Sequence, residues 1–265
     1  MKNPVHDSVI AKLSGFWSLT KSKQTMLLLV TGACGYIITT PHAMNWRELL
    51  LGVTALYLTI SGCTALNMVF DSDIDAKMSR TANRPLPRGT VRLLEAYVFG
   101  FLLSCTGFWV AWNLKPVFGL IVTIGFLIDL FVYTIWLKRL TPFSILWGGI
   151  SGGMPAMAGR VLALGHVDII GVLFALSILL WIPSHILTLI MYHAKDYAKA
   201  RIPVWPNQYG FTATRRLIAA ATLLNAVVFT ASGLLLDIQG TAMLCLLLLS
   251  ILITGVAVWC TLSPH

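Results

Sequence analysis

The chain has 265 residues, of which 57% are hydrophobic and 11% are charged. A mean hydropathy of +0.80 leaves too little polar surface for a water-soluble domain of this size, so a soluble fold is excluded. The formal net charge of +9 favours anionic substrates and anionic lipids. We expect a polytopic all-α membrane protein whose partners include the lipid bilayer and no nucleic acid.

Eight apolar stretches are long enough to cross about 30 Å of hydrocarbon as helices. They lie near 24–41, 49–70, 93–113, 117–137, 143–162, 167–192, 213–236 and 240–262. A polar stretch of about 24 residues without a small-residue cleavage site precedes the first, so no signal peptide is predicted. The five cysteines are scattered singly in apolar runs, which is typical of packed or lipid-facing residues and not of disulfides.

Basic residues concentrate in the N-terminal segment and around the loops that follow the second, fourth and sixth predicted spans. These regions carry 16 Lys and Arg residues against 3 on the other side, which predicts that both termini are cytoplasmic. The longest polar interruptions, 71–92 and 193–212, are four spans apart and therefore emerge on that same side. This layout favours one domain, 1–265, made of two four-helix halves at about 1–140 and 141–265.

The first interruption begins with acids at the end of an apolar helix. Asn67, Asp71 and Asp75 are spaced i, i+4, i+8, so they share one stripe of an ideal helix at about 100° per residue. Such oxygen ligands suit Mg²⁺, which prefers a few carboxylates together with the oxygens of a substrate phosphate. An ionic cluster beside a membrane is costly unless something ionic binds there. We therefore predict a Mg²⁺ site for a diphosphate.

The second interruption places Asp196 among basic residues, on a helix extension that Pro203 and Pro206 must end. Two carboxylate clusters on one membrane face would hold one or two Mg²⁺ ions against a diphosphate. Neutralising the diphosphate as it departs makes it a good leaving group. An apolar cavity below would store a hydrocarbon tail and keep water from a carbocation. This combination is typical of intramembrane prenyl transfer.

At these residues the chain resembles the UbiA-type intramembrane prenyltransferases, whose first motif is Asn-x-x-x-Asp-x-x-x-Asp. Within that superfamily it is most similar to the protoheme IX farnesyltransferases, or haem O synthases. The matching positions are Leu19 to Lys21, Asn67, Asp71, Asp73 to Asp75, Met78, Arg80, Thr81, Arg84 to Leu86, Gly89, Tyr133, Thr134, Leu137 to Arg139, Gly148, Gly149, Pro155, Trp181, His185, Asp196, Tyr197, Ala200, Ile202, Pro203 and Gly210.

The chain departs from the subfamily pattern in its second half. It has Trp181-Ile-Pro-Ser-His185 where the family has Trp-Gln-x-Pro-His, and Arg201 where the family has Gly. Ala200 stands where many other superfamily members carry a second acid, four residues after Asp196; haem-type members lack that acid too. The resemblance implies nine helices around a central cavity open to the cytoplasmic side, against the eight spans seen here.

Carried over residue by residue, the resemblance implies that Mg²⁺ is bound by Asn67, Asp71, Asp75 and Asp196. The diphosphate-binding candidates are Lys21, Arg80, Arg84, Lys138 and Lys195, each of which would alternatively be an ordinary positive-inside anchor. His185 is the acceptor-binding candidate, and a hydrogen-bonded structural histidine is the alternative. For His42, His166, His193 and His265 we expect structural roles.

The roles of three other polar residues, Asp73, Asp129 and Tyr133, stay open. Asp73 lies about 200° from Asp71 on an ideal helix, so it would either pair with Arg80 or Lys77 or become a ligand if the helix unwinds. Asp129 would be hydrogen-bonded to Tyr133 or Thr134, or be catalytic. The Tyr133 ring would stabilise an allylic cation if it faces the reacting carbon.

The reaction implied is Mg²⁺-dependent transfer of the farnesyl group of farnesyl diphosphate, or of a longer prenyl diphosphate, to a vinyl group of protohaem IX. Water then captures the resulting cation to give haem O, without a protein nucleophile. The alternatives are prenyl transfer to a quinone precursor such as 4-hydroxybenzoate or to a glycerol-phosphate lipid, and a non-enzymatic transporter. The transporter is disfavoured because the polar groups gather at one membrane face and not at the midplane. The predicted location is the cell membrane.

Overall fold

The computed structural model describes residues 4–40, 42 and 44–262, and every regular element in these residues is a helix. The helices are α1 (Pro4–Leu19), α2 (Ser22–Thr39), α3 (Trp46–Phe70), α4 (Ser72–Asp75), α5 (Leu93–Leu114), α6 (Pro116–Leu127), the π-helix η1 (Ile128–Leu137), α7 (Ser144–Leu164), α8 (Ile169–Ile182), the π-helix η2 (Pro183–Leu187), α9 (Thr188–Tyr192), α10 (Ala194–Lys199), α11 (Trp205–Leu235) and α12 (Gly240–Leu262). The predicted all-α class is confirmed.

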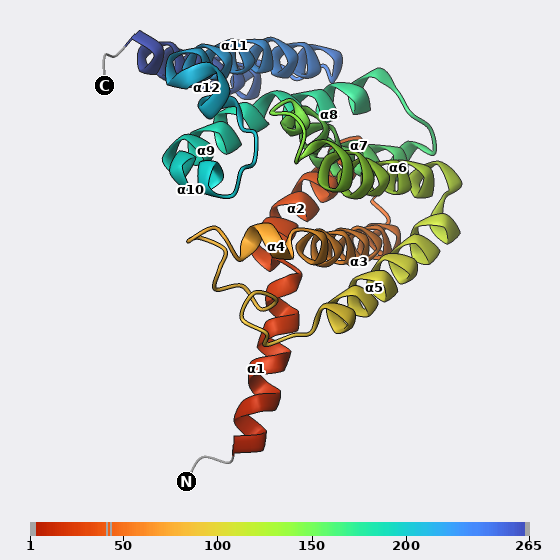
Figure 1. Ribbon diagram of the computed structural model, residues 1–265. Coiled ribbons are helices and arrows are strands. Elements are labelled where there is room, and N and C mark those ends of the chain that lie inside the picture. The colour runs from red at the N-terminus through yellow and green to blue at the C-terminus, as the bar shows by residue number, and fades with distance from the viewer. Residues whose placement is uncertain (1–3, 41, 43, 263–265) are drawn as a thin grey trace.

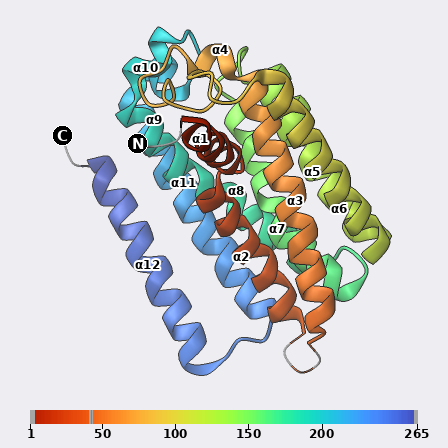
Figure 2. The same ribbon diagram turned by 90° about the horizontal axis from the view of Figure 1, so that it is seen from below.

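The long helices run side by side as a bundle, with α1, α4, α9 and α10 gathered at one end (Figure 2). In the described part of the chain, six helical segments are long and apolar enough to cross a membrane: α3, α5, α6 with η1, α8 with η2 and α9, α11, and α12. The remaining two predicted spans correspond to α2 and α7, which are less apolar because they contain more glycine and polar residues. The protein is therefore a multi-pass membrane protein.

Local sequence signals explain where several of these helices begin and end. The Asn45 side chain accepts a hydrogen bond of 3.2 Å from the Glu48 amide at the start of α3. Asp168 caps α8 in the same way, through the Gly171 amide at 2.9 Å. Gly165 ends α7 in a left-handed conformation (φ 82°), which glycine adopts without steric cost.

Glycines bring α2, α7 and α8 close together. A Cβ atom on Gly159 of α7 would lie 1.8 Å from the carbonyl oxygen of Gly32 in α2. One on Gly153 would lie 2.4 Å from the carbonyl oxygen of Ala175 in α8. Small residues permit this approach, which is how helices associate inside a membrane, where no hydrophobic force drives them together. α7 is thereby held in the middle of the bundle.

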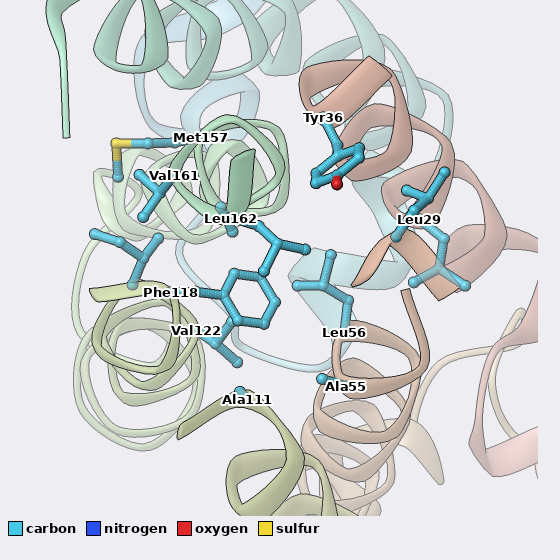
Figure 3. Packing of buried hydrophobic residues seen from close by; sticks show 13 residues of the cluster. Leu29, Tyr36, Ala55, Leu56, Ala111, Phe118, Val122, Met157, Val161 and Leu162 are labelled. Atoms are coloured by element: carbon cyan, nitrogen blue, oxygen red, sulfur yellow. The ribbon is translucent and has the colours of Figure 1, made fainter. Parts of the chain in front are cut away.

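The main apolar cluster lies where α2, α3, α6 and α7 meet. Phe118 of α6 is fully buried and lies close to Leu162 of α7 and Leu56 of α3 (Figure 3). Inside a membrane, such a side chain stabilises the fold through close van der Waals packing against its neighbours. This packing fixes α3 relative to α6, and these two helices lead into the segments that carry the site described below.

Helix α1 lies across the direction of the bundle, extending away from it in Figure 1 and seen end-on in Figure 2. Val9, Ile10, Leu13 and Trp17 are all more than half exposed along it. An exposed apolar face on a helix with this orientation is typical of an interfacial membrane helix. No helix is predicted here from the sequence, because its apolar residues alternate with polar ones and form no continuous run.

Candidate active site

The first polar loop does not continue α3 as an ideal helix. α3 ends at Phe70, and Asp71 has non-helical backbone angles (φ −94°, ψ 1°) before the single turn of α4. The backbone therefore departs from the ideal helix assumed for the shared stripe of Asn67, Asp71 and Asp75. The predicted grouping still holds, because the Asp71 amide donates to the Asn67 carbonyl at 2.9 Å and the Asp75 amide donates to the Asp71 carbonyl at 2.8 Å. Asn67, Asp71 and Asp75 are all buried.

The buried acids of this loop are paired with cations. Asp71 forms an ion pair with Lys138, which follows η1. Both carboxylate oxygens of Asp75 accept from the Arg84 guanidinium, at 2.7 and 2.8 Å. Such charge-assisted contacts are stronger than neutral hydrogen bonds, particularly where they are partly desolvated. Two of the predicted diphosphate-binding cations therefore lie directly against two of the predicted metal ligands.

Asp73 is separate from this group, on the outer side of the loop. Its side chain is 52% exposed and pairs with Arg139 at 2.7 Å. The Arg139 guanidinium holds the pKa of Asp73 below its usual range. The predicted partners Arg80 and Lys77 are therefore wrong. Arg139 also donates a hydrogen bond of 2.8 Å to the Phe70 carbonyl. These two contacts tie the start of the loop to the end of η1.

The π-helical geometry of η1 determines which of its side chains lie together. In this geometry residues five apart are neighbours, and the Lys138 amide donates to the Tyr133 carbonyl at 2.9 Å. The Lys138 ammonium lies 5.5 Å from the centre of the Tyr133 ring. π-Helices are rare and occur frequently at functional sites. Sequence reasoning missed this segment because it assumed α-helical spacing throughout the span.

Asp129, also in η1, points toward α3 and α7. Its carboxylate accepts from the Asn67 side-chain amide at 2.6 Å, from the Cys63 thiol at 3.2 Å and from the Ser151 hydroxyl at 3.0 Å. The predicted hydrogen bond to Tyr133 or Thr134 is wrong, because these three donors from α3 and α7 occupy the Asp129 carboxylate, and the buried Thr134 hydroxyl makes no hydrogen bond within the described residues.

The second polar loop meets the first. Asp196 is buried in α10 and accepts a hydrogen bond of 2.5 Å from the hydroxyl of Ser79. Arg80 and Lys195 are adjacent in sequence to these two residues, and both are exposed. α10 ends at Lys199, and α11 begins at Trp205, earlier than the predicted 213, with a backbone break at Gly210 (φ 81°). Pro206 therefore lies in the first turn of α11 and does not end a helix.

Lys21 forms the corner between α1 and α2. Its backbone is left-handed (φ 44°, ψ 50°), a strained conformation for a residue other than glycine. Burial lowers the pKa of Lys21 to about 8, and the nearby Arg84 and Lys138 also lower it, against the opposite effect of Asp129 and Asp71. Lys21 therefore lies near the same charged group.

A cavity of about 350 Å³ extends below these groups into the bundle. Lys21, Asn67, Asp129 and Tyr133 line its polar end. The rest of the wall is mainly apolar and includes Leu28, Leu56, Ile60, Val122, Phe126, Met154, Pro155 and Ala158. The cavity thus joins a charged mouth to an apolar interior.

His185 lies in the wall of this cavity, in the π-helix η2. Its ring stacks on Trp181, with the ring centres 4.7 Å apart and the planes 10° from parallel. Trp181 also lines a second cavity of about 600 Å³ between α8, α11 and α12. His193, in contrast, precedes α10 and packs edge-on against Tyr192.

Residues 28–265 match the model of the UbiA prenyltransferase family. The chain belongs to this family. The protoheme IX farnesyltransferase of Korarchaeum cryptofilum is 41% identical over 243 residues, which cover 92% of this chain and 81% of that relative. The protoheme IX farnesyltransferase of Archaeoglobus fulgidus is 40% identical over 212 residues, covering 80% and 74% of the two chains.

Solved structures share the UbiA fold. A structure described as digeranylgeranylglyceryl phosphate synthase has a TM-score of 0.79 at 22% identity, covering 96% of this chain and 89% of that one. A UbiA homologue from Archaeoglobus fulgidus bound to GPP and Mg²⁺ has a TM-score of 0.75 at 15% identity, covering 94% and 86%. Together with the family match, these comparisons show that the protein is a prenyltransferase of the UbiA family.

The oxygen atoms at the mouth of this UbiA cavity suit a divalent metal ion. Within the described residues, no three His, Cys, Asp or Glu side chains already lie together as a metal site. However, Asn67 Oδ1 and Asp71 Oδ1 are buried, and neither has a hydrogen-bond partner in the described part of the chain. A buried oxygen without a partner costs about 1–3 kcal/mol, and a bound cation would remove that cost. These two oxygens therefore suit a divalent metal ion such as Mg²⁺.

Proposed function

We propose that this UbiA enzyme transfers a farnesyl group from farnesyl diphosphate to a vinyl group of protohaem IX and so makes haem O. The observation that carries the proposal is that both polar loops meet, through Ser79 and Asp196, at one end of the bundle, and that Lys21, Asn67, Asp129 and Tyr133 line the polar end of an apolar cavity. The names of the relatives that are about 40% identical support protohaem as acceptor and the farnesyl group as donor. The basic loops favour a cytoplasmic mouth, with both termini in the cytoplasm of a cell-membrane protein.

The metal ligands in this proposal are Asn67, Asp71, Asp75 and Asp196. Bound Mg²⁺ would supply charge neutralisation for the departing diphosphate. Asn67 and Asp71 offer their unpartnered oxygens, while Asp75 and Asp196 are buried within the same two loops. The structural homologue with GPP and Mg²⁺ supports this use of a divalent ion.

The cations of the site would bind the diphosphate oxygens. Lys138 and Arg84 already lie against Asp71 and Asp75, so both ammonium and guanidinium groups are held at the cavity mouth. Lys21 lines the cavity beside them. Cleavage of the bond between farnesyl C1 and the bridging oxygen leaves the electron pair on diphosphate. Fixed positive groups stabilise this developing charge most in the transition state.

The cavity then controls the allylic cation. Tyr133 lines the wall next to the diphosphate-binding Lys138, and its aromatic face would stabilise positive charge at C1. The apolar wall would hold the prenyl tail and exclude water. The vinyl group donates its π electrons to C1, and a carbon–carbon bond forms. Water adds to the resulting cation beside the porphyrin ring and loses a proton, which gives the hydroxyethylfarnesyl group.

His185 and Trp181 are the proposed acceptor site. Their stacked rings form part of the wall of the same cavity. A flat aromatic surface suits a porphyrin, and the imidazole of His185 is a suitable axial ligand for haem iron. Arg80 and Lys195, exposed on the two loops, would attract the anionic substrate to the mouth.

The test is incubation of the purified full-length protein with farnesyl diphosphate, Mg²⁺ and separate acceptors. Haem, 4-hydroxybenzoate and a glycerol-phosphate lipid form the panel, and products are identified by mass spectrometry. We expect a haem product carrying one farnesyl group and one added water, with release of one diphosphate. Prenylation of another acceptor alone would overturn haem as substrate. Solute movement through reconstituted vesicles without diphosphate release would favour a transporter.

A further inference from the structure

Asp129 is an acidic residue inside the bundle that the proposed reaction does not use. It lies in η1, within the membrane-spanning segment formed with α6, and lines the cavity. An ionisable side chain at such a position is costly and is rarely retained without a function. The groups facing it are Asn67 and Cys63 from α3 and Ser151 from α7, and all of them donate to its carboxylate.

The hydrogen bond from Asn67 determines how the Asn67 amide is oriented. A side-chain amide carries its donor nitrogen and its acceptor oxygen on opposite sides of one plane. With Nδ2 bound to Asp129 at 2.6 Å, Oδ1 must point away from Asp129. Asn67 Oδ1 is thus left without a hydrogen-bond partner among the described residues, as is the buried Asp71 Oδ1 one turn further along the chain.

We propose that Asp129 is a positioning residue, which holds the Asn67 amide so that its Oδ1 is presented together with Asp71 to the metal ion. This inference rests on the metal site of the proposed function. Rotating the Asn67 amide by 180° would turn its NH₂ group toward the metal ion, and the partial positive charge of that group would repel the cation. A carboxylate prevents this rotation because it accepts hydrogen bonds and cannot donate them. Partners that orient a metal ligand in this way change metal affinity by about 10–100-fold when they are removed.

The experiment measures Mn²⁺ binding to the purified full-length protein by electron paramagnetic resonance, without any prenyl substrate. The variants are Asp129→Leu and Asp129→Ala, whose side chains cannot accept a hydrogen bond, and Asp129→Asn, whose amide oxygen still accepts but whose NH₂ group also donates and so permits both orientations of the Asn67 amide. Two apolar variants are used so that misfolding of one leaves the other. Ser151→Ala is the control, because it removes a hydrogen bond to Oδ1 of Asp129 and leaves the Oδ2 contact with Asn67.

We expect Asp129→Leu and Asp129→Ala to weaken Mn²⁺ binding by about 10-fold or more, Asp129→Asn to weaken it by a smaller factor, and Ser151→Ala to remain within about 3-fold of the unchanged protein. The Mg²⁺ concentration that gives half-maximal turnover should rise most in Asp129→Leu and Asp129→Ala and least in Ser151→Ala. Unchanged Mn²⁺ affinity in the apolar variants would overturn this inference and leave the proposed function standing. An equal loss in Ser151→Ala would also overturn it, because the loss would then not depend on the contact between Asp129 and Asn67. Absence of Mn²⁺ binding by the unchanged protein would overturn the proposed metal site itself.

Discussion

Ser79 and Asp196 are 117 positions apart in the chain, yet the Ser79 hydroxyl donates a hydrogen bond of 2.5 Å to the Asp196 carboxylate. This contact joins the loop after α3 to the loop before α11 at one end of the bundle (Figure 2). The two polar loops therefore lie against each other at that end. Substitutions can test the role of each group against a matched control, because residues of the same type, such as Asp71 and Asp73, lie in different environments.

Replacing Asp71 with Asn is expected to reduce turnover by at least about 100-fold, because one charge at the developing diphosphate is lost. Asp73→Asn is a matched control in the same loop, since Asp73 is exposed and paired with Arg139. We expect that control to stay within about 3-fold of the unchanged enzyme. Diphosphate release from farnesyl diphosphate measures both variants. Equal losses in the two would show that Asp71 has no special role.

The Tyr133 ring is expected to act through its aromatic face and not through its hydroxyl group. Tyr133→Phe should therefore keep turnover within about 3-fold, whereas Tyr133→Leu should lower it by about 10-fold, as a cation–π contribution of 1–2 kcal/mol implies. Single-turnover kinetics with bound substrate separate this effect from weaker binding. If Phe and Leu reduce the rate equally, the hydroxyl group is the functional part of the side chain.

Diphosphate binding is expected to weaken as Lys21 loses its proton. Because burial lowers the pKa of Lys21 to about 8 from 10.5, the folded protein binds fewer protons than the unfolded chain between these values. Charged Lys21 therefore destabilises the free protein, fully so below about pH 8. The free energy of unfolding rises as the pH increases from about 8 to about 10.5. A bound anion favours the charged form and is held best below about pH 8.

Calorimetric titration with Mg²⁺ and inorganic diphosphate between pH 6.5 and 9.5 checks the role of Lys21. Lys21→Arg is the comparison, because its guanidinium stays charged throughout. We expect the affinity of the unchanged protein to fall relative to Lys21→Arg above about pH 8. The ligand titrates in the same way in both experiments, so its own protonation cancels in the ratio. A constant ratio across this range would mean that Lys21 does not contact the diphosphate.

His185 is expected to affect the acceptor and not the prenyl donor. His185→Ala should raise the KM for haem by about 10-fold, which corresponds to 1.4 kcal/mol of lost binding, with the KM for farnesyl diphosphate unchanged. His193→Ala serves as the matched control, since His193 packs against Tyr192 outside the cavity wall. Steady-state kinetics with each substrate varied in turn give both constants. A change confined to the farnesyl diphosphate constant would contradict the assignment.

The positions of the spans and the grouping of Asn67, Asp71 and Asp75 could be predicted from the sequence. Apolar runs of membrane length leave few alternatives to helices, because every backbone group must be hydrogen-bonded within lipid. The i, i+4 spacing also survives at Asp71, where the amide still bonds to the Asn67 carbonyl despite the end of α3. The four-residue spacing of Asn67, Asp71 and Asp75 in the sequence thus matches the backbone hydrogen bonds between them.

The partners of Asp73 and Asp129 could not be predicted, because they depend on tertiary packing. Arg139 reaches Asp73 from 66 positions away, and Asn67 reaches Asp129 from 62. The π turns of η1 shift each following side chain relative to an α-helix, and no periodicity in the sequence indicates them. Helix α1 was missed for a different reason, since an interfacial helix has an apolar face but no continuous apolar run.

The central claim is that both polar loops bind one diphosphate through divalent metal ions. It is tested most directly by an experimental structure of the protein with Mg²⁺ and a farnesyl diphosphate analogue whose bridging oxygen is replaced by sulfur. We predict that Asn67 at the end of α3, Asp71 in the loop that follows and Asp196 in the second loop surround the same metal–diphosphate group, with the farnesyl tail in the cavity below. A diphosphate bound without Asp196, or a tail outside that cavity, would contradict the account.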